Sequence, residues 1–349
     1  MEHLGTFKSM VLEKPRTVSL TERNFEKLKN NEVLVLVKAC ALCGSDLHAF
    51  NGHHSRVHPP RVLGHEISGQ IVDIGKNVDP HLMDLRCCIE NHIPCGKCIY
   101  CVSDKPNLCI KADSIGFTKD GGYSEFLIAP ADCIVPLPDS VSYPIGSIMQ
   151  TMGVSYHAVK DIANVGSIEK IGIIGAGPIG LCALSVAKSL GAFVIHFDVI
   201  DYRLTAAKEL GADIVVNLNH ADPVEVSKEH TDGLGLDKII EAAGGKQDKT
   251  LQLATQLLRK SGEITVVGTF SDNQKTIRIV EFKDQEMILK GSRGHPHAFE
   301  PCLQLVQSGQ VSLEPILTHH IPLNEVQEAL EMMENKTDNV IKVVIDPAF

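Results

Sequence analysis

The sequence has no tryptophan, and aromatic residues make up only 5% of its 349 positions. This scarcity argues against a surface that stacks nucleic-acid bases or sugar rings on aromatic side chains. Basic residues are also in deficit, since 33 Lys and Arg stand against 43 Asp and Glu and give a formal net charge of −10. Nucleic-acid-binding proteins usually carry a basic surplus, so we expect no nucleic-acid partner.

Long apolar runs are missing as well. The longest uncharged stretch spans residues 171–187 and contains four glycines and one proline. A membrane-spanning helix needs about 20 mostly apolar residues, so we expect no association with a membrane. The first fifteen residues also lack the apolar segment of a signal peptide, and we expect a cytoplasmic protein.

The chain is long enough for two domains at about 150 residues each. The pattern of the sequence changes near residue 152. The first part has apolar runs punctuated by Pro and Gly, which predicts an irregular β-barrel-like domain with strands at 32–38, 67–74 and 123–128. The second part alternates strands with helices, which predicts a parallel sheet covered by helices on both faces. Its predicted strands cover 170–174, 193–197, 213–216, 238–241 and 263–267, and its helices 179–190 and 203–210. Two further helices, 298–308 and 323–335, and a strand at 340–345 follow.

Four of the eleven cysteines form a cluster. Cys95, Cys98, Cys101 and Cys109 lie within 15 residues, and no secretion signal accompanies them. In a reducing compartment such a cluster indicates metal binding before it indicates disulfides. Four thiolates complete a tetrahedral shell around one zinc ion, so this site would be structural rather than catalytic. An iron–sulfur cluster and four unrelated cysteines are the alternatives.

A dinucleotide fingerprint lies between the first strand and helix of the second part. It is the segment Gly175-Ala176-Gly177-Pro178-Ile179-Gly180. In such a turn the glycines allow a tight bend, close approach of a diphosphate, and close packing of the helix on the sheet. We expect the phosphates of the cofactor at the helix N-terminus.

The predicted second strand ends at Asp198. A carboxylate at this position accepts hydrogen bonds from the ribose hydroxyls and repels a 2′-phosphate, which favours NAD over NADP. The alternative is a solvated loop residue or a cap for the next helix. Arg203 lies near the same ribose position and weakens the discrimination, because an arginine can also bind a phosphate.

A second set of metal-ligand residue types is dispersed. Cys43 and His48 belong to one short motif, and His65 and Glu66 follow Gly64 further on. Three protein ligands with an open fourth position are typical of a catalytic zinc. A lone cysteine or histidine is more often a packing or surface residue, so this spacing alone leaves the zinc site open.

Together these motifs resemble the zinc-dependent medium-chain alcohol and polyol dehydrogenases over essentially the whole chain. The resemblance implies a GroES-like catalytic domain at 1–151 and 291–349, a Rossmann NAD-binding domain at 152–290, two zinc ions per chain, an active site between the domains, and a homo-dimer or homo-tetramer.

The same resemblance assigns roles to individual residues. It makes Cys43, His65 and Glu66 ligands of a catalytic zinc, Ser45 the proton acceptor from the substrate, and His48 a relay to solvent. The fourth ligand position, Glu or Cys in the family, is Gln150 here, and the resemblance implies that Gln150 is the fourth ligand.

The expected reaction is NAD-dependent oxidation of a secondary alcohol on a small polar molecule such as a polyol, a cyclitol or a sugar. The polar loop at 51–58 suits such a substrate, although a solvated surface loop would have the same composition. The alternatives are an amino-alcohol dehydrogenase, acting on L-threonine or an aminocyclitol, and a non-catalytic dinucleotide-binding protein.

Overall fold

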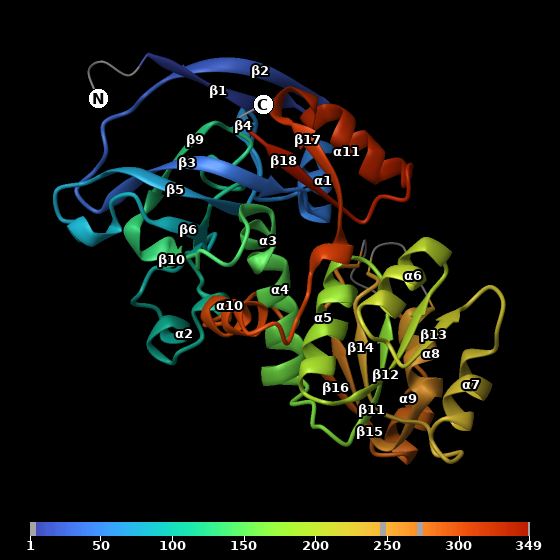
Figure 1. Cartoon of the computed structure of the whole chain (residues 1–349). Coiled ribbons are helices and arrows are strands. Elements are labelled where there is room, and N and C mark those ends of the chain that lie inside the picture. The colour runs from blue at the N-terminus through green and yellow to red at the C-terminus, as the bar shows by residue number, and fades with distance from the viewer. Residues whose placement is uncertain (1–4, 245–248, 271–274, 348–349) are drawn as a thin grey trace. The chain divides into compact units, whose positions relative to one another are not determined.

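The computed structural model describes residues 5–244, 249–270 and 275–347. The chain divides into two compact units, drawn in Figure 1. Unit 1 contains residues 1–150, 299–307 and 317–349, and unit 2 contains residues 151–298 and 308–316. The predicted assignment of one functional domain to 1–151 with 291–349 and another to 152–290 stays a prediction.

Unit 1 consists mainly of β-strands. Its largest sheet has seven strands in the order β10-β6-β5-β3-β18-β17, with β9 also paired to β3. A second sheet has the order β2-β1-β4, and β7 pairs with β8. The strands are β1 (Thr6–Lys14), β2 (Thr17–Asn24), β3 (Glu32–Ala41), β4 (Arg61–Val62), β5 (Glu66–Ile74), β6 (Arg86–Ile89), β7 (His92–Ile93), β8 (Asp113–Ser114), β9 (Phe126–Pro130), β10 (Ile134–Pro136), β17 (Leu317–Pro322) and β18 (Lys342–Asp346). This arrangement matches the predicted irregular, barrel-like β domain.

The helices of unit 1 are short. They are α1 (Gly44–Phe50), α2 (Ile99–Val102), α3 (Tyr143–Ser147), α10 (Phe299–Gln307) and α11 (Val326–Asn335), and α4 (Met149–Tyr156) begins at its boundary. The central strand β3 is buried along most of its length because β5, β9 and β18 all pair with it. Its apolar run, rather than an alternating pattern, is typical of a strand covered on both faces.

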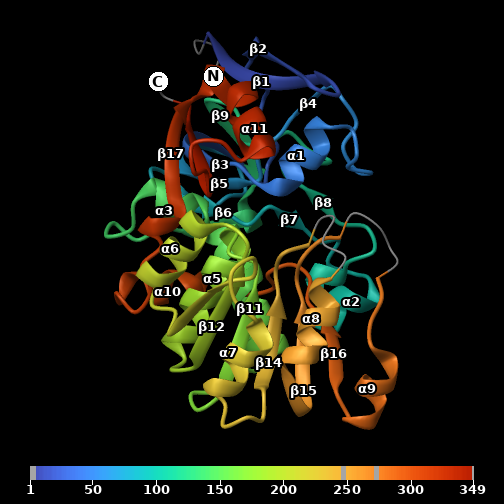
Figure 2. The same cartoon turned by 90° about the vertical axis from the view of Figure 1, so that its right-hand side faces the viewer.

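Unit 2 contains a six-stranded sheet in which all strands are parallel (Figure 2). The order β13-β12-β11-β14-β15-β16 confirms the predicted Rossmann topology. Its strands are β11 (Lys170–Ile174), β12 (Phe193–Asp198), β13 (Ile214–Asn217), β14 (Leu236–Glu241), β15 (Leu258–Val266) and β16 (Ile288–Gly291). Its helices are α5 (Pro178–Ser189), α6 (Asp201–Glu209), α7 (Pro223–Glu229), α8 (Thr250–Leu257) and α9 (Ile279–Asp284). In such sheets ligands bind at the carboxyl ends of the strands.

Some predicted elements differ from the structure at their ends. The strand predicted at 123–128 begins only at Phe126, because the backbone of Tyr123 and Glu125 bonds to β1 and β3 through Met10, Lys8 and Val37 instead of continuing one ladder. The helix predicted at 323–335 begins at Val326, after a short 3₁₀ turn. Among the residues that the structure describes, no helix has the length and apolar character needed to cross a membrane.

Candidate metal centres and dinucleotide site

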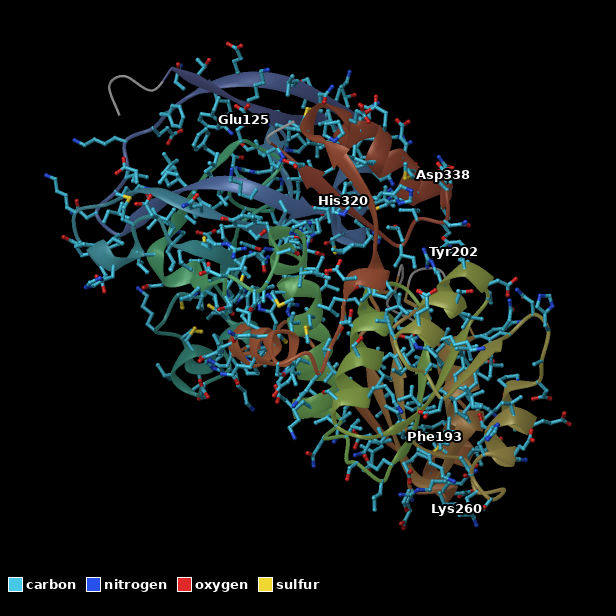
Figure 3. The ribbon with its side chains drawn as sticks, in the orientation of Figure 1. Glu125, Phe193, Tyr202, Lys260, His320 and Asp338 are labelled. Atoms are coloured by element: carbon cyan, nitrogen blue, oxygen red, sulfur yellow. The ribbon has the colours of Figure 1, made fainter. Side chains whose placement is uncertain are left out.

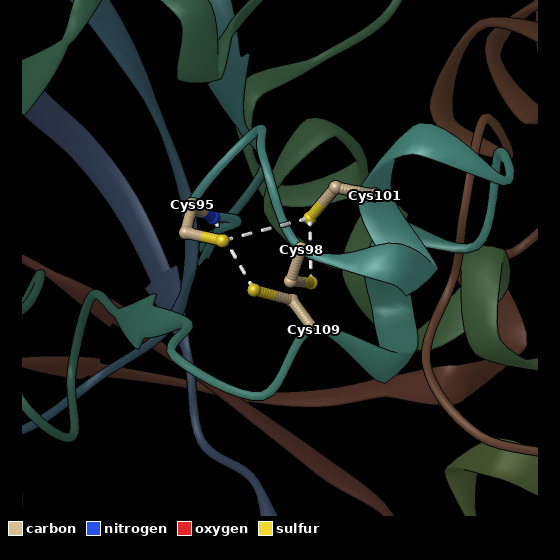
Figure 4. Close-up of side chains that lie close together, drawn as sticks. All are labelled: Cys95, Cys98, Cys101 and Cys109. Atoms are coloured by element: carbon tan, nitrogen blue, oxygen red, sulfur yellow. Dashed lines mark hydrogen bonds between the residues drawn. The ribbon is translucent and has the colours of Figure 1, made fainter.

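The four clustered cysteines lie on a lobe between β7 and β8, and their sulfurs point toward one another (Figure 4). The Sγ atoms of Cys98 and Cys101 are 3.4 Å apart, and those of Cys95 and Cys101 are 4.0 Å apart. Four ligands on a tetrahedral zinc with Zn–S bonds near 2.3 Å lie about 3.8 Å from one another. Several iron and sulfide atoms would not fit between sulfurs this close. The donor set therefore fits one zinc ion and speaks against the iron–sulfur alternative.

Backbone groups also prepare this lobe for a metal ion. The N–H groups of Cys101 and Ile110 lower the pKa of Cys98 to about 6, and the backbone N–H of Cys95 donates to the Cys109 sulfur at 3.2 Å. Zinc binds thiolates rather than thiols, so N–H groups directed at the sulfurs favour the metal-binding form.

The second metal group forms where two segments of unit 1 meet, one at the start of α1 and one at the start of β5. Cys43 precedes α1, His65 lies between β4 and β5, and Glu66 begins β5. The ligand atoms of Cys43, His65 and Glu66 all lie within 4.8 Å of one another. Atoms bound to one zinc ion are about 3.3–3.8 Å apart, so small side-chain movements close this group on an ion. The structure thus brings together three of the residues that the sequence predicts as catalytic zinc ligands.

Asp46 links the two segments that carry this group. Its buried carboxylate accepts from the backbone N–H of Cys43 at 2.9 Å, from the Tyr123 hydroxyl at 3.0 Å and from the backbone N–H of Gly64 at 3.3 Å. The His65 Nδ1 atom lies 3.2 Å from Asp46 Oδ1, which leaves Nε2 for a metal ion.

Burial disfavours the charged forms of both Asp46 and His65. For His65, Asp46 and Cys43 outweigh burial and raise its pKa well above the usual value, while the Asp46 pKa is lowered. Sequence reasoning did not single out Asp46 or Tyr123. The position of Asp46 three residues after Cys43, inside the same short motif, was the available signal.

Glu66 is fully buried and forms an ion pair with a buried lysine. Its Oε1 atom lies 2.6 Å from the Nζ atom of Lys342, the first residue of β18. Its Oε2 atom is also buried and has no hydrogen-bond partner among the described residues. A buried carboxylate oxygen without a partner is rare, and a metal ion beside it would satisfy it.

The proton-transfer residues lie on α1. The Ser45 hydroxyl is 3.4 Å from His65 Nε2 and partly buried, whereas His48, one turn further along α1, is exposed to solvent. Gln150, the second residue of α4, is partly buried, and its role as a fourth ligand stays a prediction.

An aromatic residue that the sequence analysis did not consider borders the metal group. The Phe117 ring lies 4.7 Å from the His65 ring and stacks at 4.4 Å on the ring of His54. This contact places the polar loop at 51–58 beside the metal group.

The glycine turn of unit 2 has the shape that a dinucleotide requires. Gly175 has a φ of +104°, which favours glycine, and a Cβ atom on Gly180 would lie 1.8 Å from the Gly175 carbonyl oxygen. At Gly177, the only described atom within 4 Å of such a Cβ atom is Nη1 of Arg203. Pro178 and Ile179 begin α5, so the free N–H groups of its first turn face this open space.

Arg203 and Asp198 both lie next to the glycine turn. The Arg203 guanidinium lies 5.8 Å from the ring centroid of Tyr202, which Figure 3 labels on α6. Asp198 is buried at the end of β12, and its carboxylate accepts from the backbone N–H groups of Ala176, Val199 and Ile200. Three of its roughly four acceptor positions are therefore engaged by the chain itself, and the proposed hydrogen bond to a ribose has one position left.

Comparison with known proteins agrees with this geometry. Residues 29–139 match the alcohol dehydrogenase GroES-like domain, and residues 178–308 match the zinc-binding dehydrogenase family. A D-arabitol-phosphate dehydrogenase of Enterococcus avium is 34% identical over 91% of this chain and 90% of its own length. A sorbitol dehydrogenase of Halalkalibacterium halodurans is 33% identical over 91% of this chain and 92% of its own.

Two further comparisons bear on the substrate and the cofactor. An L-threonine 3-dehydrogenase of Bacillus licheniformis is 32% identical and covers 92% of this chain and 93% of its own length. Among solved structures, an Escherichia coli CFT073 alcohol dehydrogenase in complex with NADH superposes with a TM-score of 0.91 at 29% identity. That similarity covers 98% of this chain and 99% of the other.

Proposed function

The chain belongs to the zinc-dependent medium-chain alcohol and polyol dehydrogenase family, and from this premise we propose how its residues divide the work. It is an oxidoreductase that acts on a secondary CH–OH group with NAD and zinc. In this chemistry a bound zinc ion acts as a Lewis acid on the alcohol oxygen, and NAD accepts the hydride.

The residues of unit 1 would bind and deprotonate the substrate. We assign Cys43, His65 and Glu66 to the catalytic zinc, with Gln150 as the fourth group. Ser45 would accept the hydroxyl proton, because its own hydroxyl lies beside His65 Nε2, the atom left for the metal. The exposed His48, three residues on, would pass that proton to solvent.

Two further sites would complete the enzyme. The sulfurs of Cys95, Cys98, Cys101 and Cys109 would hold a structural zinc that closes the lobe. The glycine turn of unit 2 would bind the diphosphate of NAD, with Asp198 and Arg203 near the ribose.

The observation that carries the assignment is the convergence of Cys43, His65 and Glu66. These residues come from two separate segments, and one buried carboxylate, Asp46, contacts both of them. A protein that only bound a dinucleotide would have no need to hold a thiol, an imidazole and a carboxylate at one point.

The surroundings of this group favour a neutral or anionic polyol over an amino alcohol. Residues 47–65 contain no Asp or Glu, although the whole chain is acidic. The positive charges of this stretch are those of Arg56 and Arg61, and the guanidinium of Arg56 donates to the Ala112 carbonyl. His54 stacks on Phe117 next to His65, and burial lowers its pKa below the usual value, so it is neutral near pH 7. This loop would repel the ammonium group of an amino alcohol and would attract the phosphate of a polyol phosphate.

A substrate panel tests the proposal. We would measure kcat/KM with NAD and NADP for alditols, alditol phosphates, cyclitols, L-threonine and simple alcohols. We expect the highest values with NAD and a polyol or polyol phosphate. A preference for L-threonine would reverse the substrate assignment, and a preference for NADP would show that Arg203 outweighs Asp198. A lack of turnover with every alcohol, despite bound zinc and NADH, would support the non-catalytic alternative.

We also propose that the enzyme works as a homo-oligomer in the cytoplasm. None of the eleven cysteines forms a disulfide in the structure, which suits a reducing compartment. The edge strand β16 of unit 2 exposes apolar side chains that a second copy would cover.

A further inference from the structure

One peptide group of the dinucleotide turn is hydrogen-bonded on both of its polar atoms by neighbouring side chains of β12. The carbonyl oxygen of Gly175 lies 3.0 Å from Nε2 of His196. The N–H of the same peptide, which belongs to Ala176, donates to Oδ2 of Asp198 at 2.5 Å. His196 and Asp198 are two residues apart on one strand, so both side chains project from the same face toward the turn.

We propose that His196 and Asp198 clamp the Gly175–Ala176 peptide in one orientation and that His196 is thereby a positioning residue for NAD binding. We call this pair of hydrogen bonds the clamp, and within it His196 contacts the chain only. It acts on the cofactor by fixing the bend from which the diphosphate-binding N–H groups follow.

The chemistry of the two side chains gives the clamp its direction. A carbonyl oxygen only accepts, so Nε2 of His196 must carry the proton that it donates to Gly175. A carboxylate only accepts, so Asp198 requires an N–H at its own end. If the peptide rotated by half a turn, its carbonyl oxygen would meet the Asp198 carboxylate and its N–H would meet the N–H of His196. The pair therefore stabilises one orientation and penalises the reverse.

The turn is a place where such control is needed. Gly175 adopts a φ of +104° and has no Cβ atom to limit rotation of the following peptide. On its other side the Gly175 carbonyl oxygen lies against the Cα atom of Gly180 at the start of α5. This oxygen is shielded from water between a helix and a strand, and the imidazole supplies a hydrogen bond that water cannot.

Within the described residues, the hydrogen bond to Gly175 is the one that the His196 side chain makes. Its side chain is completely buried, and its Nδ1 atom has no hydrogen-bond partner in the part of the chain that the structure describes. Burial is the main reason that the pKa of His196 is lowered to about 4. The imidazole is therefore neutral near pH 7, and the tautomer with the proton on Nε2 is fixed. An apolar residue would fill the same space at a lower desolvation cost, so the histidine points to its hydrogen bond.

A matched pair of variants separates the hydrogen bond from packing. In His196→Gln the side-chain amide nitrogen can reach the place of Nε2, and in His196→Asn, one methylene shorter, it cannot. Ile195→Ala provides the control, because Ile195 is equally buried on β12 and points to the opposite face. The dissociation constant of NADH would be measured by fluorescence, and kcat and KM for NAD by steady-state kinetics.

We expect the Asn variant to raise the NADH dissociation constant and the KM for NAD about tenfold and to leave kcat at saturating NAD within about twofold. The Gln variant should stay within about threefold of the parent protein on all three quantities. The Ile195→Ala control should lose thermal stability while its affinity for NADH remains. Equal affinities in the Asn and Gln variants, or an equal loss of affinity in the control, would overturn the proposal.

A measurement without cofactor makes the test independent of the enzyme assay. Amide hydrogen exchange of the peptide covering residues 171–181 should be faster in the Asn variant than in the Gln variant. The inference rests on the assignment of NAD to this turn. Failure of the parent protein to bind NADH would remove that assignment, whereas unchanged exchange in the Asn variant would remove the clamp alone. If the Asn variant does not fold, His196→Leu takes its place, because leucine fills the same buried space without a hydrogen-bond donor. The clamp then requires the same loss of NADH affinity and the same faster exchange relative to the Gln variant.

Discussion

The ion pair of Glu66 and Lys342 carries a larger desolvation penalty than an ion pair at the surface of unit 1. Both side chains are almost completely buried, at 0% and 1% exposure, and their charged atoms are 2.6 Å apart. Taking two charges out of water costs several kcal/mol for each ion, which their mutual attraction only roughly offsets. We infer that the pair serves to hold the Glu66 carboxylate in place beside the metal group.

Removing the lysine alone tests this view. In Lys342→Met the Glu66 carboxylate remains buried without its partner, and we expect a loss of about 3–5 kcal/mol in the free energy of unfolding after treatment with a chelator. With zinc bound the loss should be smaller, because the metal ion supplies a positive charge beside the same carboxylate. Urea unfolding of both forms measures the difference.

The matched control for that experiment is the double variant Glu66→Gln/Lys342→Met. It has no buried charge at this place and should recover a large part of the lost stability. A single variant as unstable as the double one, or a loss independent of zinc, would contradict the argument.

His196 gives a second residue-scale prediction, which concerns pH. Its pKa is about 4 in the folded chain against 6.5 as the ordinary value, so the unfolded chain binds the proton more readily. Stability from this residue is fully present above pH 6.5 and is lost as the pH falls toward 4. The total is on the order of 3 kcal/mol. His196→Gln should remove this slope, and unfolding free energies of both proteins at pH 4.5 and 7.5 would show it. Parallel pH profiles would contradict the assigned pKa.

Among individual residues, the sequence predicted the metal ligands better than the residues that hold those ligands in place. Cys43, His65 and Glu66 were recognisable because their motifs are short and their chemistry is specific. Lys342 was not, because it lies 276 residues from Glu66 and becomes its neighbour only when β18 pairs with β3. Nothing local to a lysine at the start of a strand indicates that it will be buried.

At the scale of elements, the cysteine lobe has little of its own to hold it in place. Its helix α2 has four residues, and the side chains of Ile99, Val102 and Ile110 are between 66% and 68% exposed. With so little apolar surface buried, most of the folding free energy of the lobe must come from metal binding. The sequence predicted this element well because all its ligands are local.

The lobe should therefore open without its metal ion while the rest of the chain stays folded. In Cys98→Ser we expect loss of one zinc per chain and rapid tryptic cleavage after Lys97 and Lys111, which are both exposed. Binding of NADH, which we assign to unit 2, should persist. Metal analysis, limited proteolysis and NADH fluorescence check these outcomes, and Ser103→Ala on the same lobe is the control. A resistant lobe with one zinc missing would show that packing suffices.

Elements of unit 2 were predicted more accurately than those of unit 1. The parallel strands are continuous buried apolar runs, and β11 was predicted to the residue at Lys170–Ile174. The hairpin of β1 and β2 was not predicted, because no residue of β2 is buried and its sequence contains no apolar run. Strand β16 was missed for a similar reason, since it has four residues and lies at the edge of its sheet.

At the scale of the whole molecule, the edge strand β16 has one side that a single copy of the chain leaves unpaired. Strand β16 pairs with β15 on one side and ends the sheet on the other. Ile288 and Leu289 on this strand are 48% and 43% exposed, and Ile279 and Val280 on the neighbouring α9 are 62% and 66% exposed. Proteins generally protect sheet edges with charges, prolines or a partner, and this edge carries one charged residue, Lys290.

A second copy of the chain is the partner that fits this edge. Two such strands related by a two-fold axis pair with each other, so that each copy satisfies the other's unpaired backbone groups and covers its apolar side chains. We therefore expect a dimer, or a tetramer that contains this dimer. The variant Leu289→Lys would bury a charge at the contact, so it should separate the two copies. Light scattering should then report half the particle mass of the parent protein. Ile168→Lys is the control, since Ile168 is 93% exposed in the same unit but lies before β11. The parent protein and this control should share one mass and the Leu289 variant should retain NADH binding. A parent protein that is monomeric at micromolar concentration, or a control that dissociates equally, would remove β16 as the interface.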